Sequence, residues 1–266
     1  MGALNPDQKA EGEVVGLLPA GGQGTRIAPL PCSKELFPVG FRAVNNGRNV
    51  LPKVASHYLL EKMRLAGITK AYIVLRQGKW DIPGYFGDGS MLDMNLAYLM
   101  MGSPLGPPYT LDQAYPFVAK KLVAFGFPDI VFNTKDAFRR LLTLRSEKSA
   151  DVVLGLFPAH NPCELDMVDI RGDGRIRTIT IKPRRSRLRY TWILALWSPA
   201  FSDYMHRYLN QRKSKQAAKQ SEISVGHVFQ AAIHSDLHFE GLVFEEDTWI
   251  DIGNPDDLVK AVRNFI

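Results

Sequence analysis

The chain has 266 residues, of which 45% are hydrophobic and 23% are charged, and its formal net charge is +6. This composition is that of a folded globular protein and excludes a disordered or low-complexity chain. No uninterrupted apolar run approaches the length of a membrane span, and residues 1–13 lack the apolar core of a signal peptide. The positive charge favours anionic partners such as nucleotides, sugar phosphates or nucleic acid.

The cysteines indicate a cellular compartment, and the sequence motifs limit the classes of anionic partner. Cys32 and Cys163 form neither a CxxC motif nor a disulfide framework, which suits a reducing cytosol, so we expect a cytoplasmic protein. Nucleic acid is disfavoured because the sequence holds no aromatic-rich RNA-binding motif and no zinc-finger spacing. Residues 1–13 are expected to form a flexible segment. Residues 14–266 are of a length suited to one large domain.

The order of the predicted elements indicates the fold class. Residues 14–18 form an apolar run typical of a buried parallel strand. Residues 51–66 carry apolar side chains at helical spacing, and residues 71–75 form a second buried strand. A strand, a helix and a strand in this order predict a parallel α/β sheet. Further strands are predicted at 95–100, 122–127, 151–157, 167–170, 175–181 and 191–197, and further helices at 109–118, 135–146, 199–212 and 255–265.

The turn after the first strand is the most informative stretch. It contains Gly21, Gly22 and Gly24 and is closed by Thr25 and Arg26. Because few side chains intervene, backbone N–H groups can close around phosphate oxygens, and the arginine can neutralise their charge. A glycine-rich turn alone is weak evidence, since its spacing is neither the dinucleotide fingerprint nor GxxxxGK[ST].

The whole stretch from residue 16 to residue 40 resembles the signature of sugar-1-phosphate nucleotidyltransferases, L-A-G-G-x-G-T-R-L-x-P-L-T followed by P/S-K-x-L-x-P-V. Pro19 replaces an apolar residue of that signature, and the interval between Arg26 and Lys34 is two residues shorter than in the family. The matching residues are Ala20, Gly21, Gly22, Gly24, Thr25, Arg26, Pro29, Leu30, Lys34, Leu36, Pro38 and Val39.

The resemblance implies a fold and a set of roles. The fold would be a Rossmann-like, three-layer α/β/α arrangement with a mostly parallel central sheet. A nucleotide-binding half would span about residues 14–150, and a sugar-phosphate-binding half about residues 151–266. Arg26 would stabilise charge on the leaving pyrophosphate, and Lys34 would do so at the α-phosphate. The residues implied to bind the nucleotide in this stretch are Ala20, Gly21, Gly22, Gly24 and Thr25.

A second passage indicates which nucleotide base the protein would bind. Residues 86–114 resemble the GDGS…NL…Y…P…G…QA passage of thymidylyl- and uridylyltransferases, which would set Gln113 against the base. A side-chain amide offers a donor and an acceptor to a pyrimidine edge, so UTP or dTTP is favoured. The alternative is a glutamine that faces solvent from a helix.

Two aspartates are candidate metal ligands. Asp129 follows the predicted strand 122–127, where the family has L-G-D and this chain has Phe127 and Pro128 before the aspartate. Carboxylates at the ends of parallel strands lie where ligands bind, although a turn or N-cap aspartate is the alternative. Residues 249–257 resemble W-x-D-x-G-T-P-E-D, with Asn254 in place of threonine. The resemblance implies that Asp129 and Asp251 share a Mg²⁺ ion.

The acceptor side departs further from the family. Lys182 matches the lysine of E-K-P, which contacts the sugar phosphate, but Ile181 replaces the glutamate. Glu222 resembles the family's glutamate ahead of a helix at the sugar site, whereas residues 165–168 do not match Y-G-V-V. These changes predict a remodelled pocket for an unusual sugar phosphate or a non-sugar phosphate. The basic run at 182–189 either binds a phosphorylated substrate or forms a solvated loop.

The resemblance covers about residues 14–263 and predicts an enzyme. It would be a Mg²⁺-dependent nucleotidyltransferase that joins a nucleoside triphosphate to a sugar 1-phosphate or related phosphate, giving an NDP-sugar and pyrophosphate. The alternative is a regulatory protein of the same fold that binds a nucleotide or sugar phosphate without turnover. Whether the chain forms a homo-oligomer is left open by the sequence.

Overall fold

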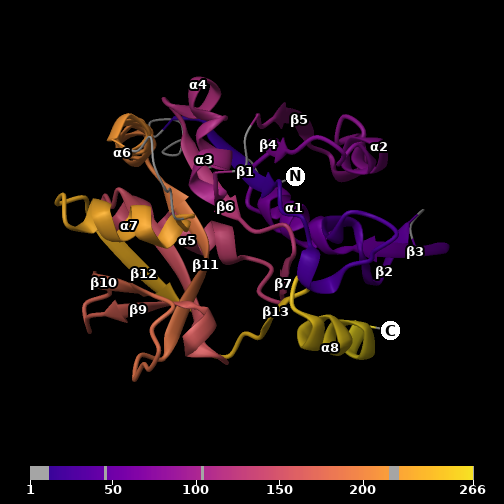
Figure 1. Ribbon diagram of the computed structural model, residues 1–266. Helices are drawn as coiled ribbons and strands as arrows, with labels where there is room; N and C mark the ends of the chain where they lie inside the picture. Colours follow the sequence, from indigo (N-terminus) through magenta and orange to yellow (C-terminus); the bar gives the residue numbers. More distant parts are fainter. Residues whose placement is uncertain (1–11, 45–46, 103–104, 216–221, 266) are drawn as a thin grey trace.

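The computed structural model describes residues 12–44, 47–102, 105–215 and 222–265 (Figure 1). The flexible segment predicted at residues 1–13 lies almost wholly outside these residues. The strands are β1 (Val14–Ala20), β2 (Pro38–Val44), β3 (Asn49–Val54), β4 (Lys70–Leu75), β5 (Asn95–Met100), β6 (Leu122–Gly126), β7 (Ile130–Phe132), β8 (Val152–Pro158), β9 (Asp166–Ile170), β10 (Ile176–Ile181), β11 (Tyr190–Trp197), β12 (Phe239–Val243) and β13 (Trp249–Asp251). The helices are α1 (Ala55–Leu65), α2 (Asp81–Phe86), α3 (Pro107–Asp112), α4 (Tyr115–Val118), α5 (Ala137–Lys148), α6 (Pro199–Lys215), α7 (Val225–Ile233) and α8 (Pro255–Phe265).

A nine-stranded sheet forms the centre of the molecule. Strands β12, β8, β11, β6, β1, β4 and β5 are neighbours in this order, and β9 with β10 pairs beside the start of β11. Strands β6, β1, β4 and β5 are parallel, as are β8 and β12, whereas β11 runs antiparallel to its three partners, β6, β8 and β9. The prediction of a mostly parallel sheet is therefore confirmed, and so is the antiparallel pairing of β9 with β10.

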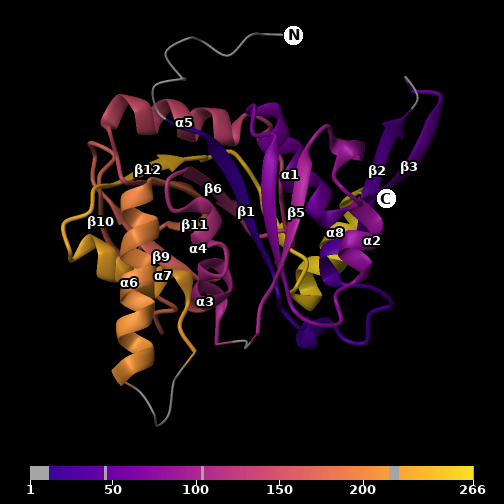
Figure 2. The ribbon, with the colours of Figure 1, turned by 90° about the horizontal axis from the view of Figure 1, so that it is seen from above.

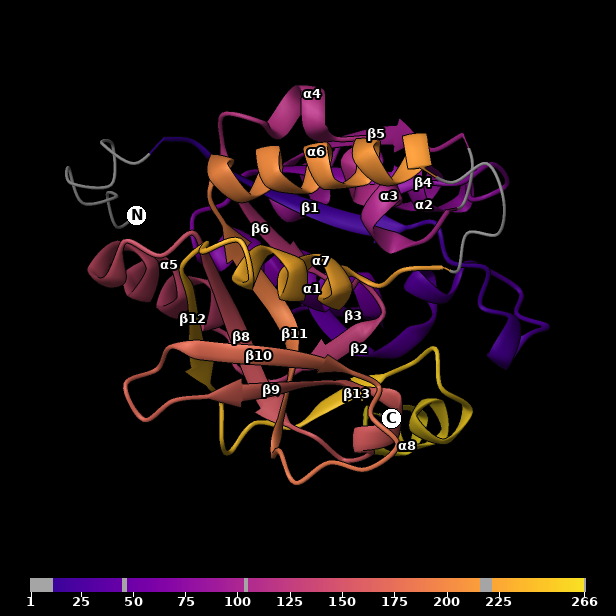
Figure 3. The ribbon, with the colours of Figure 1, turned by 60° about the vertical axis from the view of Figure 1, so that its left-hand side comes forward.

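Helices cover both faces of this sheet, which makes three layers. Helices α3, α4, α6 and α7 contribute to the core on one face, and α1, α2 and α5 contribute to the core on the other. Figure 2 shows α6 and α3 on the side of the sheet opposite α5, and Figure 3 shows α7 lying across it. Along β1, Val15 and Leu17 enter the first core and Leu18 and Ala20 the second, as expected for a strand buried on both faces. No helix in the described part of the chain is both long and apolar enough to cross a membrane.

The predicted helix at residues 51–66 begins too early. Residues 49–54 form β3, which pairs antiparallel with β2, and the helix begins at Ala55. Pro52 favours this arrangement, because the residue before a proline is biased towards extended backbone and a proline is tolerated at a sheet edge. The hairpin of β2 and β3 extends from the body of the molecule (Figure 2) and exposes Phe41, Val50 and Leu51.

A small two-stranded sheet connects two distant parts of the chain. Strand β13 pairs antiparallel with β7, and Asp251 lies opposite Ile130. The N–H of Ile252 donates to the backbone oxygen of Asp129 at 3.0 Å. Helix α8 follows and contributes Ala261 to a small core that also contains Ile252. Each of these strands has three residues, too few to give a periodic signal in the sequence.

The buried histidine of α1 makes stability sensitive to acid. Burial, together with Arg42 and Lys53, lowers the pKa of His57 to about 4. The unfolded chain therefore binds more protons than the folded chain between about pH 6.5 and about pH 4, and stability falls as the pH falls through this window. We expect the free energy of unfolding to drop by about 2 kcal/mol between about pH 7.5 and about pH 5 from this residue.

Urea unfolding at the two pH values measures this loss. The variant His57→Leu should lose about 2 kcal/mol less than the wild type over the same interval. His234→Leu is the matched control, because His234 is exposed, and it should keep the wild-type pH dependence. An identical pH dependence in wild type and His57→Leu would contradict the assignment.

Candidate functional site

The glycine-rich turn lies at the carboxyl end of β1, near the centre of the parallel strands. Gly24 has φ 66°, a left-handed conformation that glycine adopts without strain. A Cβ on Gly21 would lie only 2.6 Å from Sδ of Met101, so a larger residue would require the Met101 side chain or the turn to shift. Ligands bind at this end of the strands in open α/β sheets.

Lys34 lies against the glycine-rich turn despite the short interval from Arg26. It begins the short 3₁₀ helix η3 (Lys34–Leu36), and its Nζ pairs with Oδ2 of Asp129. The position of a Cβ on Gly22 lies 3.5 Å from Cε and 3.6 Å from Nζ of Lys34. The shortened interval therefore does not remove the lysine from the predicted aspartate.

The carboxylates of Asp129 and Asp251 converge on one point. The position of a Cβ on Gly253 lies 3.0 Å from Oδ1 of Asp251 and 3.3 Å from Oδ2 of Asp129. Nζ of Lys34 lies 3.2 Å from the same position. Arg26 completes the group, with its Nη2 3.5 Å from Oδ2 of Asp251. A side chain at position 253 would fill this space, which glycine leaves open.

The electrostatics of this group follow from its burial. Burial and the neighbouring Asp129 raise the pKa of Asp251, and the N–H of Gly253, Lys34 and Arg26 only partly oppose this. Burial lowers the pKa of Lys34, but the adjacent carboxylates, Asp129 first, outweigh it and raise the pKa overall. The site thus holds two carboxylates close together, an arrangement that a cation stabilises.

These two carboxylates fit a hard divalent ion. Carboxylate oxygens are the ligands such ions prefer, and Mg²⁺ commonly takes one or two carboxylates together with substrate phosphates and water. Among the residues that the structure describes, no group of three or more Asp, Glu, His or Cys side chains could hold a metal. A metal at Asp129 and Asp251 would therefore depend on ligands from the substrate and from water.

A cavity of 560 Å³ opens beside the turn, a volume that suits a nucleotide-sized ligand. The glycine-rich turn forms one side, the segment 105–110 forms another, and Lys34 and Asp129 line it as well. Glu222 also lines this cavity; its Cγ lies 3.2 Å from the position of a Cβ on Gly106. The lining residues are Pro19, Gly21, Gly22, Gln23, Thr25, Lys34, Glu35, Met101, Leu105, Gly106, Pro107, Thr110, Phe127, Asp129 and Glu222.

A second cavity, of 520 Å³, contains Lys182. It is also lined by Arg26, Cys163, Glu164, Asn254 and Pro255. Thr25 lines the first cavity and Arg26 the second, so the end of the turn contributes to both. The two residues predicted for the sugar phosphate, Lys182 and Glu222, line different cavities.

Gln113 lies outside the lining of the first cavity. Its side chain is exposed, and its Nε2 donates to the backbone oxygen of Tyr109 at 3.3 Å. Thr110, three residues earlier, is buried and lines the cavity instead. Gln113 was predicted as the base contact because of the resemblance. Whether its side chain points into the cavity depends on how the short helix packs, which a motif does not encode.

These features define an α/β protein with a glycine-rich turn, two cationic side chains and a pair of carboxylates gathered at the carboxyl end of its parallel strands. The family model of the nucleotidyl transferases matches residues 15–266. The chain therefore belongs to the nucleotidyl transferase family, as its signature predicted.

Individual relatives are distant. The chain is 25% identical over 255 residues to the low-salt glycan biosynthesis nucleotidyltransferase of Haloferax volcanii, covering 92% of this chain and 64% of that protein. It is 22% identical over 255 residues to the glucose-1-phosphate thymidylyltransferase of Streptomyces antibioticus, covering 94% of this chain and 65% of that protein. The chain thus spans less than two thirds of the length of either relative.

Solved structures share the fold. A Bacillus anthracis protein assigned as a glucose-1-phosphate thymidylyltransferase, in complex with sucrose, superposes with a TM-score of 0.77 at 17% identity, covering 94% of both chains. The UTP-bound UGPase of Acinetobacter baumannii gives a TM-score of 0.72 at 16% identity, covering 95% of this chain and 93% of that one. These likenesses confirm the predicted α/β fold.

Proposed function

We propose that the protein transfers a nucleotidyl group from a nucleoside triphosphate to the phosphate of a sugar 1-phosphate or a related acceptor. The observation that carries this proposal is the convergence of Arg26, Lys34, Asp129 and Asp251 where the two cavities meet the turn. The first cavity would hold the triphosphate, and the second, with Lys182, would hold the acceptor phosphate.

The reaction needs no covalent intermediate on the protein. An oxygen of the acceptor phosphate attacks the α-phosphorus, the bond from that phosphorus to the bridging oxygen breaks, and pyrophosphate leaves with the electron pair. Arg26 would neutralise charge on the pyrophosphate, Lys34 charge at the α-phosphate, and Lys182 would hold the attacking phosphate. Catalysis then consists of positioning and charge stabilisation.

Mg²⁺ is the proposed cofactor, held by Asp129 and Asp251. Bound there, the ion would supply positive charge to the phosphate oxygens during transfer. Its support is the donor set, since two carboxylates with open positions suit Mg²⁺ and substrate phosphates together. Arg26 and Lys34 would keep the two carboxylates oriented through their ion pairs.

UTP or dTTP is the proposed donor. The support is the naming of several relatives as thymidylyltransferases and the UTP bound to a protein of the same fold. The hydroxyl of Thr110 donates to the backbone oxygen of Gly106 at 3.3 Å, which leaves a lone pair able to accept the N3–H of a pyrimidine. Among the residues lining the first cavity, we therefore propose Thr110 as the base contact in place of Gln113.

A pyrophosphate-release screen tests the function. Purified protein with Mg²⁺ is offered each of the common triphosphates together with a panel of sugar 1-phosphates and several non-sugar phosphates. We expect release with UTP or dTTP and at least one acceptor, and none when the acceptor is omitted. Tight binding of a triphosphate by calorimetry, without release for any acceptor, would support the regulatory alternative. If the protein neither binds a triphosphate nor releases pyrophosphate, both assignments are contradicted.

A further inference from the structure

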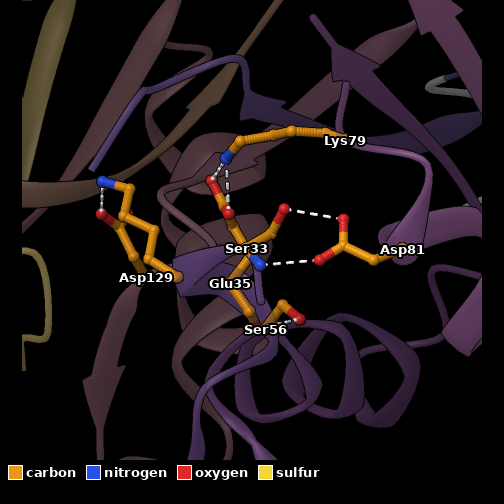
Figure 4. Close-up of polar contacts among 7 residues, drawn as sticks. Ser33, Glu35, Ser56, Lys79, Asp81 and Asp129 are labelled. Atoms are coloured by element: carbon orange, nitrogen blue, oxygen red, sulfur yellow. Dashed lines mark hydrogen bonds and ion pairs between the residues drawn. The ribbon is translucent and has the colours of Figure 1, made fainter. Parts of the chain in front are cut away.

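The segment that carries Lys34 is held on both sides of the lysine by residues 79–81, where the chain enters α2. Figure 4 shows Ser33 against Asp81 and Glu35 against Lys79, with Asp129 on the far side. Lys79 lies in the connection between β4 and α2, and Asp81 is the first residue of α2. The contacts join residues 44 to 48 positions apart in the sequence.

The first pair fixes the backbone before Lys34. The N–H of Ser33 donates to Oδ2 of Asp81 at 2.6 Å, and its hydroxyl donates to Oδ1 of the same carboxylate at 2.8 Å. A charged acceptor that takes a backbone and a side-chain donor from one residue sets both the position and the orientation of that residue.

The second pair fixes the residue after Lys34. Nζ of Lys79 donates to Oε1 and Oε2 of Glu35 at 2.7 and 2.6 Å, and the side chains are only 9% and 1% exposed. The hydroxyl of Ser56, in α1, donates to the backbone oxygen of Glu35 at 2.8 Å. A buried ion pair adds little net stability, because desolvation offsets the attraction, but removing one partner is costly, so Glu35 is held at Lys79.

We propose that Lys79 and Asp81 are positioning residues that hold Lys34 at Asp129 in the transferase site, an inference that rests on the proposed function. The side chain of Lys34 is long and flexible, so its reach is defined by its anchored backbone and by the carboxylate it meets. Held at Ser33 and Glu35, the backbone directs the amine into the cavity that contains Asp129.

Charge gives Lys79 a second effect on Lys34. Glu35 lines the same cavity as Lys34 and Asp129, so its carboxylate is a second acidic group on the wall that the amine of Lys34 faces. Lys79 neutralises Glu35 and thereby leaves Asp129 as the carboxylate that holds Lys34. Without Lys79, Glu35 would be a buried carboxylate that has lost its ion-pair partner, and the segment that carries Lys34 would lose this anchor.

A double-mutant cycle separates positioning from a merely structural role. Lys79→Met should lower kcat for pyrophosphate release by about 10²-fold, the size of loss that a misplacement of about 1 Å causes. In a Lys34→Met background the same change should lower kcat by less than about twofold, because its effect acts through Lys34. Equal losses in both backgrounds, or an unchanged kcat in Lys79→Met, would overturn the proposal.

Two further variants test whether a loss of turnover in Lys79→Met comes from misfolding. Asp81→Asn changes an exposed side chain, should fold normally, and should lower kcat by about tenfold with the same dependence on Lys34. Lys70→Met removes an exposed lysine that pairs with Glu13 at the opposite end of β4, and it should turn over like the wild type. Full activity in Asp81→Asn would overturn its part of the proposal.

A crystal structure of the Lys79→Met or Asp81→Asn variant provides a measurement that needs no turnover. We expect Nζ of Lys34 to leave Asp129, moving beyond the 4 Å of an ion pair, while the wild-type crystal retains the contact. Persistence of the contact in both variants would overturn the positioning role. A wild type that releases no pyrophosphate would instead overturn the proposed function, and the crystal structures would still decide on the positioning of Lys34.

Discussion

Replacing Asp129 with asparagine is expected to lower kcat for pyrophosphate release by about 10³-fold, or about 4 kcal/mol of transition-state stabilisation. The amide removes the charge proposed to bind the metal ion and deprives Lys34 of its charged partner. Asp251→Asn should cause a loss of similar size, because its carboxylate converges on the same point. Steady-state rates over a range of Mg²⁺ concentrations measure both effects, and the apparent affinity for Mg²⁺ should fall in each variant.

Asp93→Asn is the matched control for this change. Asp93 is 84% exposed and has φ 52°, a left-handed conformation that asparagine tolerates well. We expect it to keep wild-type turnover and wild-type dependence on Mg²⁺. Turnover within about tenfold of the wild type in both Asp129→Asn and Asp251→Asn would rule out the proposed metal site, since a lost ligand costs more than that.

Arg26→Ala should also lower kcat by about 10³-fold, the lower end of what an arginine contributes when it neutralises phosphoryl charge. Its side chain is 59% exposed and meets Asp251 at 3.5 Å, so the fold does not depend on it. The free energy of unfolding should therefore change by no more than about 0.5 kcal/mol. Turnover assays and urea unfolding on the same preparation separate the two effects.

A conservative variant and a control variant accompany Arg26→Ala. Arg26→Lys keeps the charge but loses the planar, bidentate geometry, so its kcat should lie between those of wild type and Arg26→Ala. Arg177→Ala removes another exposed arginine that pairs with an aspartate, Asp169 at 3.3 Å, and should leave kcat unchanged. Near-normal turnover in Arg26→Ala would remove the arginine from the proposed mechanism.

The sequence predicted the sheet and the centre of the site because their signals are local. Apolar runs mark the buried strands, and the residues of the glycine-rich turn are contiguous, so neither requires knowledge of distant contacts. Asp129 and Asp251 were identified by resemblance at two separate motifs, and the pairing of β7 with β13 brings them together. That pairing itself was not predicted, because three-residue strands carry no period.

Other parts of the site depend on contacts that sequence patterns do not encode. Gln113 and Thr110 lie about one helical turn apart, and only packing decides which of them lines the cavity. Glu222, predicted to lie at the sugar site, lies against Gly106 and lines the first cavity, and that position follows from tertiary packing. Lys79 and Asp81 are charged residues around the start of α2, and a sequence pattern alone places such residues in solvent.

The two-stranded sheet of β7 and β13 has a consequence for how the protein is made. The proposed metal site takes one carboxylate from residue 129 and the other from residue 251, and its cations come from residues 26 and 34. During translation, the ribosome releases the glycine-rich turn and Asp129 long before β13 emerges. A nascent chain can therefore build most of its sheet while still lacking the second carboxylate, and the complete site arises only after β13 has paired with β7.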